Sequence, residues 1–301
     1  MKIISTARIW HDLRHNAFTD LCQFKNIYYL AFRTAETHHS LDGYIQILSS
    51  VDGENWQDCA TISRQSTDLR DPKFTLNPDG TLSFHSMEVR ELDSVRQHQS
   101  LIFTSADGLH WDQGYYIGEP SIWIWRAKWH QDDCYAIGYN INFTRLYRKS
   151  TGRDFSIHKP ILFERGFSNE SDWVYLQDGT MAVLLRRDGK TDNSAMLGIS
   201  QGDYSQWVWH DLKIRIGGPC LLYLNDNLIL AAIRTYSEKD AHVELHKLDI
   251  QQQKLVPLLT LPSAGDCSYA GMIKQGDQVW ISFYSSHEDE STDIYLAQLQ
   301  I

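Results

Sequence analysis

The sequence has little positive charge, few cysteines and no long hydrophobic run. Its 301 residues hold 28 Lys and Arg against 38 Asp and Glu, a formal net charge of -10, which disfavours a basic face for nucleic acid or anionic membrane. No apolar stretch approaches the roughly 20 residues that span a bilayer, and the N-terminus has no signal-peptide core. The 5 cysteines are widely spaced and odd in number, as expected for buried thiols in a reducing compartment. We therefore expect a cytoplasmic protein that binds neither nucleic acid nor membrane.

Several catalytic motifs are also missing. The sequence contains no nucleotide-binding P-loop, no dinucleotide-binding G-x-G-x-x-G and no G-x-S-x-G nucleophile elbow. Its 13 histidines form no H-E-x-x-H, and its cysteines form no C-x-x-C. We therefore expect no catalytic transition metal and no cofactor.

What the sequence does contain is a repeat of close to fifty residues. Six segments that run from polar or small residues into an apolar stretch begin at Asn16, Asp71, Ser121, Asn169, Gly217 and Asp266. In each unit a turn rich in Asp, Asn or Gly follows, and then a second apolar stretch, which is typical of a β-hairpin. A third strand follows in all units and a fourth in five of them.

Four strands in each of six units, without an amphipathic helix, predict an all-β fold, a six-bladed β-propeller that forms a single domain over residues 1–301. The sixth unit ends after its third strand, and the N-terminal K-I-I-S-T-A-R-I-W can supply the missing fourth strand and close the ring. A five-bladed ring and a two-sheet fold are the structural alternatives.

Two turns after third strands carry a recognisable pattern. They read S-V-D-G-E-N-W (Ser50 to Trp56) and S-A-D-G-L-H-W (Ser105 to Trp111), where Asp-Gly makes a tight turn and the tryptophan packs on the blade. These stretches resemble the Asp-box (BNR) turns of sialidase-type propellers. Worn versions, S-T-G-R-D-F and S-Q-G-D-Y-S-Q-W, follow in later units.

Two further segments resemble sialidases. In the stretch from Asn169 to Arg187 a glutamate precedes a strand, a D-G turn and an arginine, and D-C-S-Y-A-G-M-I resembles the stretch with the nucleophilic tyrosine. The resemblance implies a glycoside hydrolase for a sugar that carries a carboxylate, sialic-acid-like or uronic-acid-containing. It also implies that Tyr269 is the nucleophile, that Glu170 is its base, and that arginines hold the carboxylate.

In a propeller, the starts of first strands and the ends of second strands meet at one mouth of the central channel. Counting seven residues on from Asn26, Gly179 and Asn227 reaches Arg33, Arg186 and Arg234. Three arginines at equivalent positions favour a local cationic site for a carboxylate. Salt bridges to neighbouring acidic residues are the alternative for each arginine. The candidate substrate-binding residues are Arg33, Arg70, Asp71, Arg126, Arg186, Arg187, Arg234, Asp266 and His287.

The sequence departs from the sialidase pattern in the first unit. His15 stands where the first family arginine belongs, and the loop T-A-E-T-H-H-S-L-D-G offers Glu36, His38, His39 and Asp42 without a clear match to the general acid. Histidine titrates near neutral pH, so His15 and His38 are candidate catalytic residues. A second hypothesis is therefore a histidine-dependent glycosidase or lyase acting at uronate or rhamnose linkages.

Aromatic residues support a glycan ligand. Trp123 and Trp125 alternate along one strand, so they are expected to point to the same side, where sugar rings stack. Tyr269 has a structural alternative as well, an aromatic whose hydroxyl caps the start of a strand. A third hypothesis follows, a non-catalytic propeller that binds glycan or protein.

Overall fold

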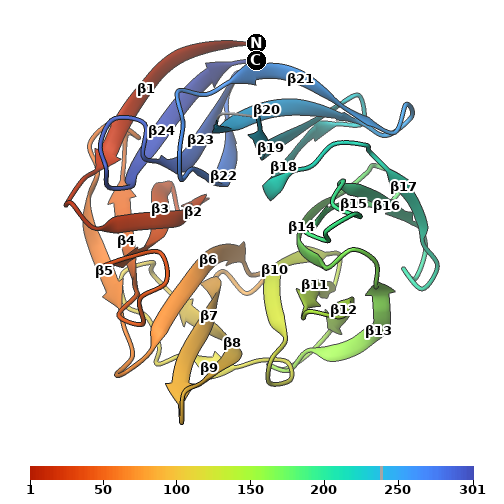
Figure 1. Cartoon of the computed structure of the whole chain (residues 1–301), viewed down its shortest axis with the longest axis horizontal. Coiled ribbons are helices and arrows are strands. Elements are labelled where there is room, and N and C mark those ends of the chain that lie inside the picture. Colours follow the sequence, from red (N-terminus) through yellow and green to blue (C-terminus); the bar gives the residue numbers. More distant parts are fainter. Residues whose placement is uncertain (238–239) are drawn as a thin grey trace.

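Six four-stranded antiparallel sheets, arranged in a ring, form the computed structural model, which describes residues 1–237 and 240–301. Figure 1 shows the blades in chain order around a central axis. The sequence prediction of a six-bladed all-β propeller is confirmed. None of the described residues forms a helix that is long and apolar enough to cross a membrane.

Each blade runs from an inner strand at the channel to an outer strand at the rim. The first blade comprises β2 (His15–Phe24), β3 (Ile27–Ala35), β4 (Tyr44–Ser50) and β5 (Gln57–Ile62). The second comprises β6 (Asp68–Leu76), β7 (Leu82–Leu92), β8 (Val95–Ser105) and β9 (Tyr115–Tyr116). The third comprises β10 (Trp123–His130), β11 (Asp133–Tyr139), β12 (Thr144–Lys149) and β13 (Ser156–Phe163). The fourth blade comprises β14 (Ser168–Tyr175), β15 (Met181–Arg187), β16 (Met196–Ser200) and β17 (Val208–Asp211). The fifth comprises β18 (Gly217–Asn225), β19 (Leu228–Tyr236), β20 (Ala241–Asp249) and β21 (Lys254–Thr260). The sixth comprises β22 (Ser268–Gln275), β23 (Gln278–Ser285), β24 (Asp293–Gln300) and β1 (Lys2–Trp10).

The N-terminal strand completes the sixth blade, as expected. Strand β1 pairs antiparallel with β24, from Lys2 opposite Gln300 to Trp10 opposite Ile294. The two ends of the chain consequently lie side by side at the rim of the ring (Figure 1).

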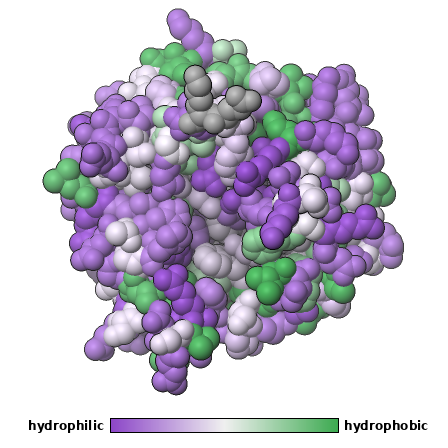
Figure 2. All heavy atoms as spheres, in the orientation of Figure 1, coloured by the Kyte–Doolittle hydropathy of each residue, from purple (hydrophilic) through white to green (hydrophobic). Residues whose placement is uncertain are grey.

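Hydrophobic side chains between neighbouring blades form the core. The cluster between the first and sixth blades, for example, joins Leu30 and Phe32 to Trp280 and Leu296. The inner strand β2 is buried almost throughout, whereas the outer strand β5 has only exposed and partly buried residues. All 5 cysteines are free and all but Cys59 are buried. The surface in Figure 2 is mostly hydrophilic, with hydrophobic residues scattered over it.

A β-bulge interrupts the inner strand of every blade, between its first and second halves. Four of the bulged residues have positive φ: Phe18 (65°), Asp71 (53°), Gly218 (50°) and Tyr269 (48°). A bulge turns a side chain away from the ordinary strand alternation. The bulges therefore set which side chains converge on the channel, and the spacing of polar and apolar residues does not reveal them.

The two Asp-Gly turns lie at the end of the strands opposite the predicted channel mouth, and they share one hydrogen-bond pattern. Ser50 Oγ accepts from the Gly53 amide at 2.8 Å, and Asp52 Oδ1 accepts from the amides of Glu54 and Asn55 at 2.9 and 2.8 Å. The second turn repeats these contacts through Ser105 and Asp107. Both turns pack against the blades, and they lie away from the residues described next.

Candidate active site

Tyr269, Glu170 and Arg186 meet at the mouth of the channel. Tyr269, in the bulge of β22, donates its hydroxyl hydrogen to Glu170 Oε1 at 2.6 Å. Arg186 Nη1 donates to the same carboxylate oxygen at 2.6 Å and lies 3.3 Å from the Tyr269 hydroxyl. The Gly218 amide donates to Glu170 Oε2 at 2.9 Å. Strands from the fourth, fifth and sixth blades thus hold one phenol against one carboxylate.

The environment keeps the Tyr269 phenol protonated. Burial raises its pKa well above the ordinary value, and the negative charge of Glu170 raises it further, whereas Arg186 and Arg234 oppose the shift. A neutral phenol that donates to a carboxylate can act as a nucleophile only as that carboxylate takes its proton. The geometry therefore couples deprotonation of Tyr269 to Glu170.

Arg234 is the arginine of this group that has no carboxylate partner among the described residues. Its Nε donates to the Tyr236 hydroxyl at 3.0 Å, its Nη1 to the Cys267 carbonyl at 3.4 Å, and its guanidinium lies 5.9 Å from the centre of the Tyr269 ring. Arg186, by contrast, also pairs with Asp188 at 2.9 Å. Arg234 is therefore the guanidinium best placed to accept an incoming anion.

The equivalence predicted among three arginines is wrong by one residue in the fourth blade. Arg33 lies opposite Ala17 and Arg234 opposite Gly217, directly before the bulges, and the residue in that place in the fourth blade is Arg187, opposite Ser168. The turn between β14 and β15 is longer than in the other two blades, which displaces the count. Arg187 itself donates to Ser194 and pairs with Asp211 at 3.4 Å, so its guanidinium is held within its own blade.

Arg33 and Arg70 do not line the channel as substrate ligands. Arg33 is 0% exposed and pairs with Asp68 at 2.6 Å, and Arg70 pairs with the same carboxylate. Their remaining donors reach the loop after β3: Arg33 contacts the carbonyls of Thr37 and Ser40, and Arg70 that of His38. The two arginines therefore fix the loop that carries His38.

Arg126 is likewise committed to a buried ion network. It pairs with Asp20 at 3.1 Å and Asp172 at 3.6 Å, and Lys128 also pairs with Asp172. Both carboxylates accept backbone amides as well, from Phe74 and Leu221. This network ties five inner strands together at the channel and engages the Arg126 guanidinium.

Asp71 is a buried carboxyl group without a partner. It is 7% exposed, sits in the bulge of β6, and makes no hydrogen bond or ion pair with any residue in the described parts of the chain. Burial raises its pKa to about 7; the charge of Glu170 adds to this, and Lys73 and Arg70 oppose it. Asp71 is electrostatically coupled to Glu170, and its charge also raises the pKa of Tyr269.

His15, His38 and Asp266 form a second cluster at the same rim. His15 Nε2 lies 3.0 Å and His38 Nδ1 2.9 Å from Asp266 Oδ2, and Tyr284 donates its hydroxyl hydrogen to Asp266 Oδ1 at 2.8 Å. These contacts hold the pKa of Asp266 far below its usual range despite burial, and burial lowers the pKa of His15. The ring of Phe18 lies between this cluster and Tyr269, 5.3 Å from His38 and 5.1 Å from Tyr269, centre to centre.

The remaining candidates are separate from both groups. His287 lies 3.0 Å from Ser285 Oγ and 4.7 Å from the Tyr295 ring, so it packs between β23 and β24. Trp123 and Trp125 do not share a neighbourhood, because the bulge of β10 breaks their alternation. Trp125 contacts Tyr269 at 5.5 Å, whereas Trp123 stacks on Tyr139 at 6.0 Å.

The sequence analysis missed three residues around Tyr269. Lys73 is buried, donates to the Thr19 carbonyl at 2.8 Å, and lies 5.3 Å from the Trp125 ring and 5.9 Å from the Tyr269 ring. Phe18 and Tyr284 pack on the same tyrosine. A lysine inside the apolar run R-D-P-K-F-T-L is a signal that could have been noticed, because a buried amine needs a specific partner.

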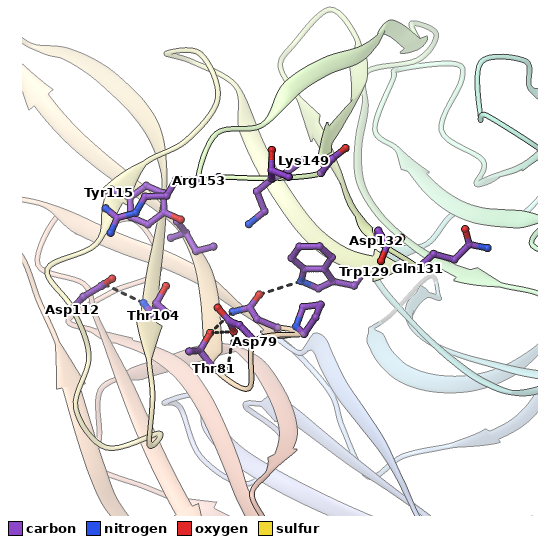
Figure 3. A pocket seen from close by; sticks show the side chains of 16 residues that line it. Asp79, Thr81, Thr104, Asp112, Tyr115, Trp129, Gln131, Asp132, Lys149 and Arg153 are labelled. Carbon is purple, nitrogen blue, oxygen red and sulfur yellow. Dashed lines mark hydrogen bonds between the residues drawn. The ribbon is translucent and has the colours of Figure 1, made fainter.

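Two hollows adjoin the ring at different places. A cavity of about 390 Å³ lies directly beside His15, His38 and Asp266. A cavity of about 540 Å³ lies between the second and third blades, at the opposite end of the strands, and includes Asp79, Trp129 and Lys149 (Figure 3). None of the candidate catalytic residues lines the second hollow.

Comparison with solved structures shows the fold. A Dyadobacter fermentans protein of unknown function matches with a TM-score of 0.87 at 17% identity, over 100% of this chain and 99% of that one. The NanB sialidase of Streptococcus pneumoniae matches with a TM-score of 0.74 at 9% identity, over 100% of this chain and 71% of that one. An alpha-L-arabinanase of Penicillium chrysogenum, complexed with arabinobiose, matches with a TM-score of 0.69 at 10% identity, over 100% and 99% of the two chains.

No protein-family model matches the sequence, and no curated protein matches it either. At these identities the structural likeness is one of fold, a propeller shared with glycoside hydrolases that act on different sugars. The chain is a six-bladed propeller of the sialidase-like type, and its activity has to be argued from its own side chains.

Proposed function

We propose that the protein is a glycoside hydrolase for a sugar that carries a carboxylate. The observation that carries the proposal is the 2.6 Å hydrogen bond from the Tyr269 hydroxyl to Glu170, beside Arg186 and Arg234. A phenol held against a buried carboxylate within a cationic field has the parts of an activated nucleophile. A tyrosine nucleophile is also the known exception among retaining glycosidases, found in sialidases.

In the proposed reaction, Glu170 takes the phenolic proton as Tyr269 Oη attacks the anomeric carbon. The bond from that carbon to the leaving oxygen breaks, and an acid donates a proton to the leaving group. Water then attacks the glycosyl-tyrosine intermediate and gives a proton to the conjugate base of that acid, and Tyr269 leaves as Glu170 returns its proton. Two displacements give net retention of configuration.

Asp71 is the group we assign as the acid. A general acid must be protonated near the working pH and must lose its proton readily. The partnerless carboxyl of Asp71, with its pKa raised by burial to about 7, meets both conditions. Glu36 of the loop is exposed and Asp42 pairs with Arg14 at 2.6 Å, so neither carboxyl group is buried without a partner as Asp71 is.

Arg234, with Arg186 beside it, is the proposed ligand of the substrate carboxylate. A guanidinium holds a carboxylate with two parallel hydrogen bonds, and Arg234 has donors that no carboxylate of the described chain occupies. The clamp lacks a third arginine, because Arg33 is consumed by Asp68. We therefore propose uronic-acid and sialic-acid sugars alike as substrate classes, and small saccharides in the cytoplasm as the source.

The test is release of a fluorescent leaving group from a panel of sialosides, uronides and neutral glycosides. We expect activity confined to acidic sugars, and Tyr269→Phe reducing it on the order of 10³-fold or more. Full activity in Tyr269→Phe would sink the proposal. Binding of acidic sugars without turnover in the wild type would instead support a non-catalytic glycan-binding propeller.

A second candidate function is favoured by the contact of His15 and His38 with Asp266 beside a cavity. It is the histidine-dependent glycosidase or lyase for uronate or rhamnose linkages. In that case His15→Ala abolishes turnover while Tyr269→Phe is nearly silent. The same panel, run with both variants, separates the two candidates.

A further inference from the structure

We propose that His15, His38 and Asp266 bind one divalent transition-metal ion of the zinc class at the rim of the channel. The inference reverses the expectation of no such metal, which rested on the absence of short sequence motifs. It stands apart from the proposed hydrolysis, in which no step uses this ion.

The geometry of the three side chains suits a shared ion. His15 Nε2 and His38 Nδ1 approach the same oxygen of Asp266 at 3.0 and 2.9 Å, and all three ligand atoms lie within 4.8 Å of one another. Around a tetrahedral Zn²⁺ with ligand bonds near 2.0 Å, ligand atoms are separated by about 3.3 Å. The two nitrogen-to-oxygen distances are within a few tenths of an ångström of that separation, and the two nitrogens lie no farther than 4.8 Å apart.

Other residues hold two of the three ligands, His38 and Asp266, in place. The loop with His38 is fixed by hydrogen bonds from Arg33 to Thr37 and Ser40, and from Arg70 to the His38 carbonyl. Asp266 is oriented by Tyr284 on its second oxygen, and its amide donates to Ser286 Oγ at 3.0 Å. Such outer hydrogen bonds are what orient the ligands of metal sites.

The charge around Asp266 leaves room for a cation. No lysine or arginine of the described chain pairs with Asp266, whose partners are two imidazoles and a phenol. A comparable group of His11, Asp289 and Asp293 is already occupied, because Arg8 pairs with both carboxylates at 2.6 and 3.2 Å. Only the first of these two groups is therefore proposed as a metal site.

The cavity beside the cluster supplies the open position. It has a volume of about 390 Å³ and also contains Glu36, Glu290 and Arg14. Arg14 is paired with Asp42 at 2.6 Å, so Glu36 and Glu290, which pair with no cation among the described residues, give this cavity an acidic lining. An ion with three protein ligands and one open position is the arrangement of catalytic rather than structural zinc sites.

The ligand types select the class of ion. Two imidazoles and one carboxylate suit Zn²⁺ and its first-row neighbours, whereas Mg²⁺ and Ca²⁺ prefer sets made of oxygen alone. We therefore expect Zn²⁺ and Co²⁺ to bind, and Mg²⁺ and Ca²⁺ to compete poorly.

The test uses the full chain without a histidine tag, stripped with a chelator and titrated with Zn²⁺ against a chromophoric chelator. We expect one ion per chain, and with Co²⁺ the intense visible absorption of a tetrahedral site. His38→Ala, on a partly exposed loop, should weaken Zn²⁺ binding by roughly 100-fold or more, and Tyr284→Phe by about 10-fold. His11→Ala, in the group that Arg8 occupies, is the matched control and should bind as the wild type does.

Several outcomes would overturn the inference. They are a stoichiometry well below one ion, equal affinity in wild type and His38→Ala, and a weak octahedral Co²⁺ spectrum, which indicates adventitious surface binding. Melting curves of the stripped proteins test whether His38→Ala is folded.

Tyr269→Phe separates this inference from the proposed function. It should lose turnover and keep the ion. Ion binding in a wild type without glycosidase activity would contradict the proposed function alone. Glycosidase activity without ion binding would contradict the proposed metal site alone.

Discussion

At the scale of single residues, the site depends on groups whose charge or shape is set by burial. Asp71 is the clearest case, because its carboxyl lies in the bulge of β6 with no partner in the described structure and a pKa raised to about 7. If Asp71 is the acid, its removal matters most when the leaving group is poor. We expect Asp71→Asn to lower turnover of alkyl glycosides by about 100-fold or more, and that of an activated phenyl glycoside far less. Equal losses with both leaving groups would contradict this role.

The same carboxyl group makes stability depend on pH in a defined direction. Its pKa is raised on folding, so between about pH 4 and pH 7 the folded chain keeps a proton that the unfolded chain has released. The wild type should therefore lose stability as pH rises through this window, and Asp71→Asn should lose less. Urea unfolding at pH 5 and pH 8 measures both slopes, and parallel slopes would show that Asp71 titrates normally.

Gly218 illustrates a shape constraint. Its φ is 50°, and an added Cβ would lie 2.4 Å from Ser268 Oγ and 3.2 Å from the Tyr269 ring. We expect Gly218→Ala to cost about 1–2 kcal/mol of unfolding free energy and to reduce kcat by displacing Tyr269. Gly80→Ala, also at positive φ but with open space around it, is the control for the backbone cost alone. Equal kcat in both variants would separate Gly218 from the site.

At the scale of elements, the loop of residues 36–43 is held by arginines that look, in the sequence, like substrate ligands. Arg33 and Arg70 were predicted as substrate ligands, and both instead pair with Asp68. Asp68, their shared partner, lies outside the quoted motifs, and its pairing with Arg33 joins separate blades, which leaves no mark on local sequence. The bulges cannot be read from the sequence either, because the extra residue looks like ordinary strand sequence.

Removing the Arg33 anchor should therefore act on the loop. Arg33→Met leaves the fully buried Asp68 with one partner fewer, and we expect a loss of roughly 3–5 kcal/mol and faster amide exchange over residues 36–43. Arg14→Met, which breaks an exposed pair with Asp42 in the same loop, should cost about 0–1 kcal/mol. Unchanged exchange in Arg33→Met would show that the loop is held by other contacts.

At the scale of the whole molecule, the repeat was sufficient to predict the fold. Hairpin turns every fifty residues predicted six blades, and the missing strand of the last blade predicted its completion by the N-terminus, because a sheet edge at the closure point has to be paired. The site was predicted less completely. Tyr269 and Glu170 were found through a resemblance, whereas the offset of Arg187 and the contact of two histidines with Asp266 needed coordinates.

Closure of the ring by β1 leads to a further prediction. Deleting residues 1–10 removes β1 and exposes β24, whose neighbours β23 and β22 carry Tyr284 and Tyr269. We expect the truncated chain to lose cooperative unfolding and glycosidase activity together, and a peptide of residues 1–11 added in trans to restore both. A truncated chain that still melts cooperatively would show that closure by β1 is dispensable.

The pairing of Lys2 with Gln300 has a last consequence. Because the first and last strands are hydrogen-bonded neighbours, a short linker between the two ends would convert the chain into a circle without moving a strand. New ends could then be opened at Gly80 or Gly276, in exposed hairpin turns of other blades. Circular permutants of this kind should keep the same ring and the same site, because the order of the blades in space is independent of where the chain is cut.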